Sequence, residues 1–183
     1  MSRLRIVVLL AVVAFAITSR PARSQDNGAT EAPLVTRGRI QLNLAGAETI
    51  LTAARHKASS MKLKMNIAVV DEGGHLLAFA RMDGARPASG TTAMTKAVSA
   101  ATFRQETGTL PAKGEPDMLL SLSIQNAAMA SGGRITTLKG GVPVEFDGQI
   151  IGAVGCGGGT GDQDAQIAKA GIQALNEELA RRK

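Results

Sequence analysis

The sequence predicts an α+β domain in which helices cover an antiparallel sheet of about five strands, in the order α-β-β-α-α-β-β-β-α. Three observations support this class. Apolar residues recur every three to four positions in segments that begin near residues 44 and 162, as in amphipathic helices. Short apolar runs lie between them, and tight glycine-containing turns join neighbouring runs, which requires antiparallel strands. With 183 residues, 44% of them hydrophobic, the chain is long enough for one domain with a core.

The first half of the predicted domain contains a helix, a hairpin and a second helix. The first helix has an apolar stripe made of Leu44, Ala47, Leu51, Ala54, Ala58 and Met61. Residues 65–70 form a buried strand, the turn Asp71–Gly74 follows, and residues 75–81 return as its partner. Residues 91–106 form an alanine-rich helix, and its many small side chains allow close packing on two sides.

The second half contains a less regular helix, three strands and a final helix. Residues 111–116 form a loop, and residues 117–130 form the third helix. Three strands are expected at 134–138, 142–146 and 149–156, with turns at 139–141 and 147–148. The final helix runs from residue 162, and its inner face contains Ile167, Ala168, Gly171, Ile172, Leu175 and Leu179.

The first 24 residues are typical of a cleaved secretory signal peptide. Arg3 and Arg5 precede an apolar run from residue 6 to residue 17, and small residues stand at 22 and 24. This run of about 12 residues is shorter than the roughly 20 that a membrane span needs. We therefore expect a mature chain that begins near Gln25, has a flexible segment at 25–37 and a single domain at 38–183, and is periplasmic or secreted, with no membrane span after cleavage.

Charge and aromatic content argue against a nucleic-acid partner. The whole chain has a formal net charge of +6, but the leader holds four of the 21 basic residues and no acid, so the mature chain carries 17 basic and 15 acidic residues. Its only aromatic side chains are those of Phe79, Phe103 and Phe146. Proteins that bind single strands stack bases on aromatic rings, and few are present here. One cysteine also excludes an internal disulfide scaffold and a multi-cysteine metal cluster.

Two segments resemble a known family. These are IAVVDEGGHLLAFARMDGARPASGTTAMTKAVSAATF, residues 67–103, and LKGGVPVEFDGQIIGAVGCGGGTGDQDAQIAKAGIQAL, residues 138–175. Their ordered motifs are similar to those of the GlcG/HbpS haem-binding family, which is related to the C-terminal domain of PduO-type corrinoid adenosyltransferases. The resemblance implies a profilin-like, helix-covered sheet, assembly into homo-oligomers, and binding of haem or a related tetrapyrrole. The sequence departs from the family at Cys156-Gly157, where a Val or Ile and then a Ser are common.

Three side chains are candidate axial ligands of haem iron, and His75 and Cys156 are also candidate metal ligands. His75 opens the second strand, and its imidazole either ligates iron or holds the turn or a neighbouring subunit. Cys156 precedes a glycine-rich run and a helix N-terminus, which favours a thiolate. A buried inert thiol and a cross-link between two subunits remain open for Cys156. Met82 is the third candidate.

Two basic residues and two glycines complete the candidate binding site. Arg81 and Lys96 match family positions, and both could pair with haem propionates or another small anionic ligand. Lys96 has the alternative of extending its side chain along an oligomer interface. Gly140 and Gly141 either shape the turn or line a pocket.

The sequence therefore favours an exported, oligomeric haem- or tetrapyrrole-binding protein that acts as a sensor or scavenger. The alternative is a periplasmic catabolic enzyme, or an accessory subunit of one, that acts on a small organic acid near Lys96 and Gly141. A third reading is a structural partner of a periplasmic protein. No nucleophilic triad or metal-ligand spacing stands out, so the sequence identifies no catalytic residue.

Overall fold

The computed structural model describes residue 35 and residues 37–111 and 114–182. The chain divides into two units at residue 36, and the fold belongs to the second, residues 37–183. The expected signal peptide and most of the segment 25–37 lie outside the described residues.

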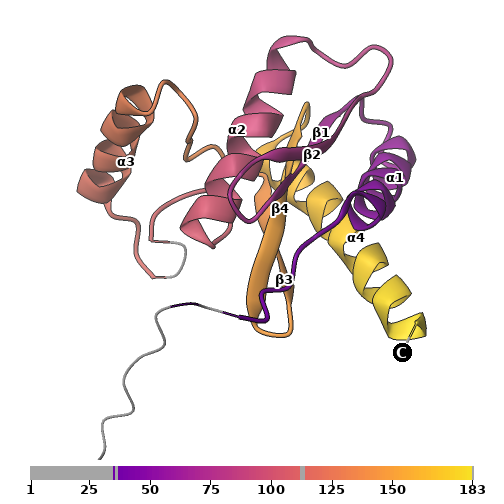
Figure 1. The fold of residues 1–183 in the computed structure, drawn as a ribbon. Helices are drawn as coiled ribbons and strands as arrows, with labels where there is room; N and C mark the ends of the chain where they lie inside the picture. Colours follow the sequence, from indigo (N-terminus) through magenta and orange to yellow (C-terminus); the bar gives the residue numbers. More distant parts are fainter. Residues whose placement is uncertain (1–34, 36, 112–113, 183) are drawn as a thin grey trace, which may run out of the picture. The chain divides into compact units, whose positions relative to one another are not determined.

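A four-stranded antiparallel sheet forms the centre of the domain (Figure 1). Its strands are β1 (Asn66–Asp71), β2 (Leu76–Arg81), β3 (Gly141–Phe146) and β4 (Gln149–Gly157), in the spatial order β2-β1-β4-β3. Both predicted hairpins are present, and β1 and β4 pair antiparallel at the centre, where β1 is almost wholly buried. In the second turn, Asp147 and Gly148 both have positive φ, at 47° and 72°, as a two-residue hairpin turn requires.

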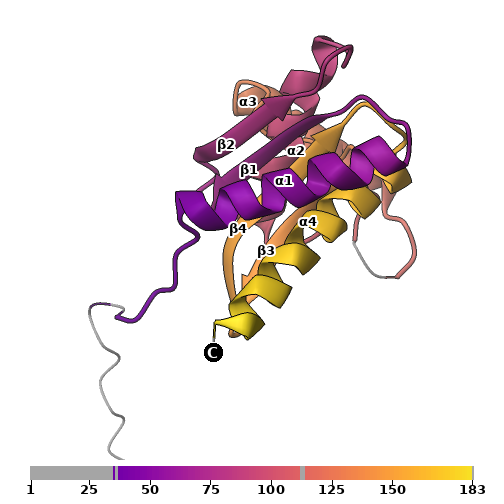
Figure 2. The ribbon, with the colours of Figure 1, turned by 90° about the vertical axis from the view of Figure 1, so that its right-hand side faces the viewer.

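Helices cover both faces of this sheet. Two helices, α1 (Leu44–Ser60) and α4 (Gly161–Arg181), lie together on one face, as Figure 2 shows. The core on that side includes Ile50, Ile67 and Ile167. The opposite face packs on α2 (Ala88–Phe103), where the contacts are made by small side chains on both partners, namely Ala68, Val70, Ala93, Ala97, Ala100, Ala101 and Ala153. The α+β class is confirmed, with four strands in place of about five.

The strand predicted at 134–138 is wrong, because this segment is irregular. Side chains from distant parts of the chain satisfy its backbone groups. The Thr136 N–H donates to Oγ of Ser99 over 2.8 Å, and the Leu138 carbonyl accepts from Oγ1 of Thr107 over 2.7 Å. The segment therefore has partners for its polar backbone groups without joining the sheet.

The remaining helix, α3 (Met118–Ala130), is apolar yet has no buried residue. It begins at Asp117, whose carboxylate accepts from the Leu120 N–H over 3.0 Å. Leu119 is 76% exposed and Met129 is 81% exposed. Figure 1 shows α3 set apart from the sheet, on the side away from α1 and α4. Among the described helices, none is sufficiently long and apolar to cross a membrane.

Candidate functional site

Four of the seven predicted site residues come together between α2, β4 and the start of α4. Lys96 lies on the buried stripe of α2, and its side chain is 7% exposed. Its ammonium group donates to the Asp164 carboxylate over 2.6 Å and to the Cys156 carbonyl over 3.0 Å. Gly140 packs against the same two charged residues, and Gly141 packs against the backbone of Lys96. The ammonium group of Lys96 is therefore already paired inside the protein and does not face the surface.

Asp164 is the member of this cluster that the sequence did not reveal, because an acidic residue in the first turn of a helix is typical of a cap. The N-cap is Thr160, which forms a capping box with Gln163. Asp164 lies on the buried face of α4, where one carboxylate oxygen binds Lys96 and the other accepts from the Gly159 N–H over 3.0 Å. The sequence does place a charged residue, Lys96 or Asp164, on the apolar stripe of each of the two helices. This pattern could have indicated the pair, since buried charges need partners.

Gly140 and Gly141 are where the turn meets this buried pair. Gly140 has φ of 124°, and a Cβ there would lie 2.5 Å from Cβ of Asp164. A Cβ on Gly141 would overlap the carbonyl oxygen of Lys96. These glycines allow β3 to run against α2 and α4, and the space around Lys96 is filled by protein atoms.

Cys156 is fully buried in β4. Burial raises the pKa of its thiol well above the ordinary value, and the charge of Asp164 adds to this while that of Lys96 opposes it. The thiol is therefore protonated at neutral pH and, lacking exposure, does not reach a second subunit. Of the three readings of Cys156, the geometry favours the inert buried thiol.

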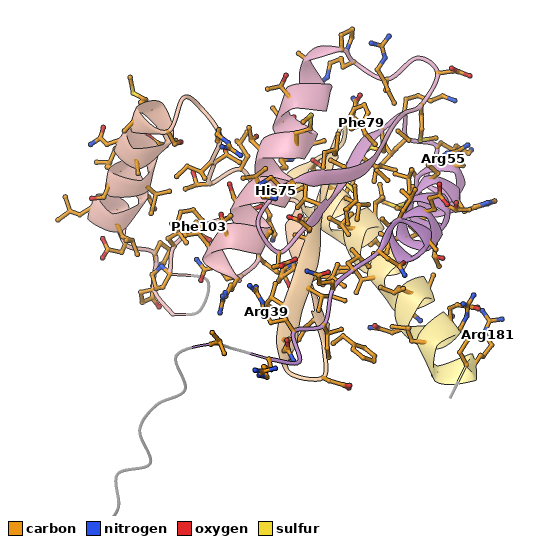
Figure 3. The ribbon with its side chains drawn as sticks, viewed as in Figure 1. Arg39, Arg55, His75, Phe79, Phe103 and Arg181 are labelled. Carbon is orange, nitrogen blue, oxygen red and sulfur yellow. The ribbon has the colours of Figure 1, made fainter. Side chains whose placement is uncertain are left out.

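His75 lies elsewhere, at the end of the hairpin that β1 and β2 form (Figure 3). Its side chain is 76% exposed, and Nδ1 lies 3.1 Å from the Asp71 carboxylate. That carboxylate also accepts from the backbone N–H groups of His75 and Gly73. Burial works to raise the pKa of Asp71, but these hydrogen bonds outweigh it and the pKa is lowered. The turn thus holds the ring by Nδ1 and leaves Nε2 outward.

Arg81 and Met82 lie at the opposite end of β2 from His75. His75 and Arg81 are six positions apart along extended chain, about 20 Å at the usual rise. Arg81 is exposed, and Met82 packs partly against the core. His75 and Met82 therefore cannot ligate the same iron within one chain, and neither lies at the Lys96 cluster.

Two open surface hollows among the described residues measure about 460 and 680 Å³, and a more enclosed cavity measures about 230 Å³. It lies between the segment before α1 and the end of α4, and its walls include Leu42, Phe146 and Leu175. Pockets for cofactors usually begin near 300 Å³. Within residues 37–111 and 114–182, no cluster of three or more His, Cys, Asp or Glu side chains is arranged to hold a metal ion.

Comparison with known proteins gives consistent results. Residues 42–173 match the family described as haem degrading protein HbpS-like. Protein GlcG of Escherichia coli K12 is 42% identical over 117 residues, which cover 64% of this chain and 81% of that protein.

Two solved structures share the fold. One is a double mutant of HbpS from Streptomyces reticuli, with a TM-score of 0.62 and 30% identity, covering 79% of this chain and 97% of that one. The other is a complex of PduOC with haem, with a TM-score of 0.62 and 26% identity, covering 75% of this chain and 96% of that one.

Proposed function

The chain belongs to the HbpS-like family, and from this premise we propose that it binds haem. The observation that carries the proposal is the likeness to PduOC, a relative solved as a complex with haem, over 75% of this chain. Binding without a catalytic step is the simplest function consistent with the described residues, which suits a haem sensor or scavenger.

The residues of this chain fit haem at His75. An imidazole whose Nδ1 is held by a carboxylate presents Nε2 as a metal ligand in a fixed orientation, and the Asp71–His75 pair has this arrangement. Leu76, the next residue in the chain, is a large apolar side chain that is 48% exposed. Haem would supply the iron and its redox chemistry, and this chain would supply one ligand and apolar contacts.

A second copy of the chain is proposed to close the haem site. The 230 Å³ cavity is small for a cofactor, and large apolar side chains on α3 stay in solvent. A single copy of the chain therefore neither encloses a cofactor nor buries α3. Burial of such a surface against another copy would exclude water from bound haem. We therefore propose that the protein is a homo-oligomer, with α3 in the contact.

Titration with hemin tests the binding proposal. Protein side chains do not absorb in the Soret region, so the haem band is easy to follow. We expect a saturable Soret shift at micromolar protein, and a shift in band position with at least about tenfold weaker binding for His75→Ala, because the iron loses its ligand. His56→Ala is the matched control, since His56 is exposed on α1. Absence of a saturable shift in the unmodified protein would contradict haem binding, and an unchanged spectrum in His75→Ala would reject this ligand alone.

The oligomer is tested by replacing Leu119 with glutamate. Leu119 is 76% exposed on α3, so the change costs no packing within one chain, but it places a charge in the proposed contact. We expect light scattering to show a multimer for the unmodified protein and a smaller species for Leu119→Glu. Ser123→Glu, at an exposed polar position of the same helix, is the control for added charge. A monomeric unmodified protein would refute the proposal.

We also propose that the protein is exported and acts in the periplasm or outside the cell. The basic residues, apolar run and small residues of the first 24 positions support this. Cell fractionation followed by N-terminal sequencing should find a chain that begins near Gln25, and a cytoplasmic chain that retains Met1 would contradict export.

A further inference from the structure

Exposed basic side chains gather at one end of the sheet, where β1 begins and β2 ends. This surface, hereafter the basic end, consists of Lys62, Lys64, Arg81 and Arg86, all of which are exposed. Arg81 is the cross-strand neighbour of Asn66, and the Asn66 amide nitrogen donates to the Arg86 carbonyl over 3.0 Å. A Cβ on Gly84 would lie 3.9 Å from Cγ of Lys64, so the Lys64 side chain passes close to the loop that follows β2.

The charge of the basic end is not neutralised by ion pairs within the described chain. Three segments meet here, residues 61–66, 81–87 and 157–160, and Asp83 is their single acid. Among the described residues, none of the four bases takes part in an ion pair. Asp162, just beyond the third segment, is paired with Lys139. Four bases against one acid leave the basic end with a formal net charge of +3.

The two hairpin turns at the other end of the sheet carry acids instead. Residues 71–75 and 145–148 contain four acids and no Lys or Arg, namely Asp71, Glu72, Glu145 and Asp147. Figure 1 shows the loop from β2 to α2 at the top of the view and the turn between β3 and β4 at the bottom. Asp71 accepts from the His75 N–H over 2.8 Å, and Glu72 lies 3.4 Å from Arg39. Two of these acids therefore have partners already, whereas the bases of the basic end form no ion pair among the described residues.

The basic end offers charge on an open surface. Its four bases line neither the two hollows nor the 230 Å³ cavity described above. The neighbouring apolar side chains of Met61, Leu63 and Met82 are partly buried and pack against the core. Its three segments contain no aromatic residue on which a nucleic-acid base could stack. A small anion has no enclosing walls here, while an extended anionic surface requires only exposed bases that lie side by side.

From these observations we propose that the basic end docks on a membrane surface rich in anionic phospholipid. Each exposed Lys or Arg adds attraction to such a surface, and the attachment is electrostatic and reversible because the apolar neighbours are directed to the core. The acidic hairpin turns face away from the membrane, so the uneven charge orients the domain on it. A second copy fits the basic end less well, since Asp71 and Glu72 are already paired. This assigns Arg81 a role other than binding haem propionates, at the opposite end of β2 from His75.

Co-sedimentation with lipid vesicles tests the proposal. The chain used begins at Gln25, so that the basic leader does not contribute, and it keeps the whole unit 37–183. We expect binding to phosphatidylglycerol vesicles at about 20 mM salt, at least about tenfold weaker binding at about 150 mM salt because the charges are screened, and none to phosphatidylcholine vesicles. Absence of binding to phosphatidylglycerol at low salt, or equal binding to both lipids, would overturn the proposal.

Replacing Lys62 and Lys64 together with glutamine separates the basic end from the charge of the whole protein. Both residues are exposed and lie outside helices and strands, so the variant is expected to fold and to bind phosphatidylglycerol vesicles at least about tenfold more weakly. The matched control replaces Arg104 and Arg134 with glutamine, which removes the same charge from exposed positions beyond the other end of α2. Its binding should fall by less than about threefold. An equal loss in the two double variants would mean that the basic end is not the docking surface.

Two further measurements distinguish the membrane from other partners of the basic end. Inorganic phosphate at matched ionic strength should not release the protein from vesicles, and release would indicate a site for free phosphate instead. Light scattering without lipid should give the same size for the unmodified protein and the Lys62→Gln, Lys64→Gln variant. A smaller variant would show that the basic end contacts another copy, and this would overturn docking on lipid. Hemin titration of the same variant should be unchanged, so failure of this proposal is distinguishable from failure of haem binding at His75.

Discussion

Replacing Lys96 with alanine is expected to lower the free energy of unfolding by about 3–5 kcal/mol, because it leaves the Asp164 carboxylate buried without its counter-charge. Asp164 is 2% exposed, and the Gly159 N–H is its remaining hydrogen-bond donor. The Cys156 carbonyl loses a donor at the same time. Urea denaturation followed by circular dichroism at neutral pH measures the change.

Two controls show whether the loss comes from the unpaired charge. Lys139→Ala removes an exposed ion pair with Asp162 on the same helix end and should change stability little. The double variant Lys96→Met with Asp164→Leu removes both buried charges together, and most of the stability should return, because neither charge is left alone. If Lys96→Ala lost less than about 1 kcal/mol, the value typical of an exposed pair, the buried pair would not hold these elements together.

The hairpins and the amphipathic helices were predictable because their signals are local. Asp147-Gly148 favours a tight turn, and the stripe on α1 repeats within a few residues. The segment 134–138 was predicted as a strand from its short β-branched run. Its backbone partners are the side chains of Ser99 and Thr107, which lie more than 30 residues away, so no local pattern could reveal them.

Several residues of the candidate site were predictable from the sequence, but which of them lie together in the fold was not. Lys96 and Asp164 are separated by 68 positions, and their pairing depends on how α2 and α4 meet across β4. His75 and Met82 are close in sequence, yet the extended strand between them places them far apart.

Replacing Gly155 with alanine is expected to cost about 3 kcal/mol or more, because one added methyl group has no space between the sheet and α2. Gly155 lies in β4 and pairs with both Ala68 and Gly141. A Cβ there would overlap the Ala93 carbonyl oxygen and the Ala97 amide nitrogen, and would lie 3.0 Å from the Ala97 methyl group. Two of these three neighbours are helix backbone, so a change of rotamer cannot relieve the overlap.

The comparison with Gly90→Ala isolates this effect, since both variants add one methyl group at the interface of α2 and the sheet. At Gly90 the methyl group has space, and replacing a helical glycine should stabilise the protein by about 0.5–1 kcal/mol. At Gly155 the same group would push α2 away from β4. The distances from the Lys96 ammonium group to the Asp164 carboxylate and to the Cys156 carbonyl would then increase. Thermal unfolding of both variants, with pulse proteolysis in lysate if Gly155→Ala is insoluble, measures the difference. Equal stability of the two would mean that α2 does not lie as close to β4 as the Lys96 pair requires.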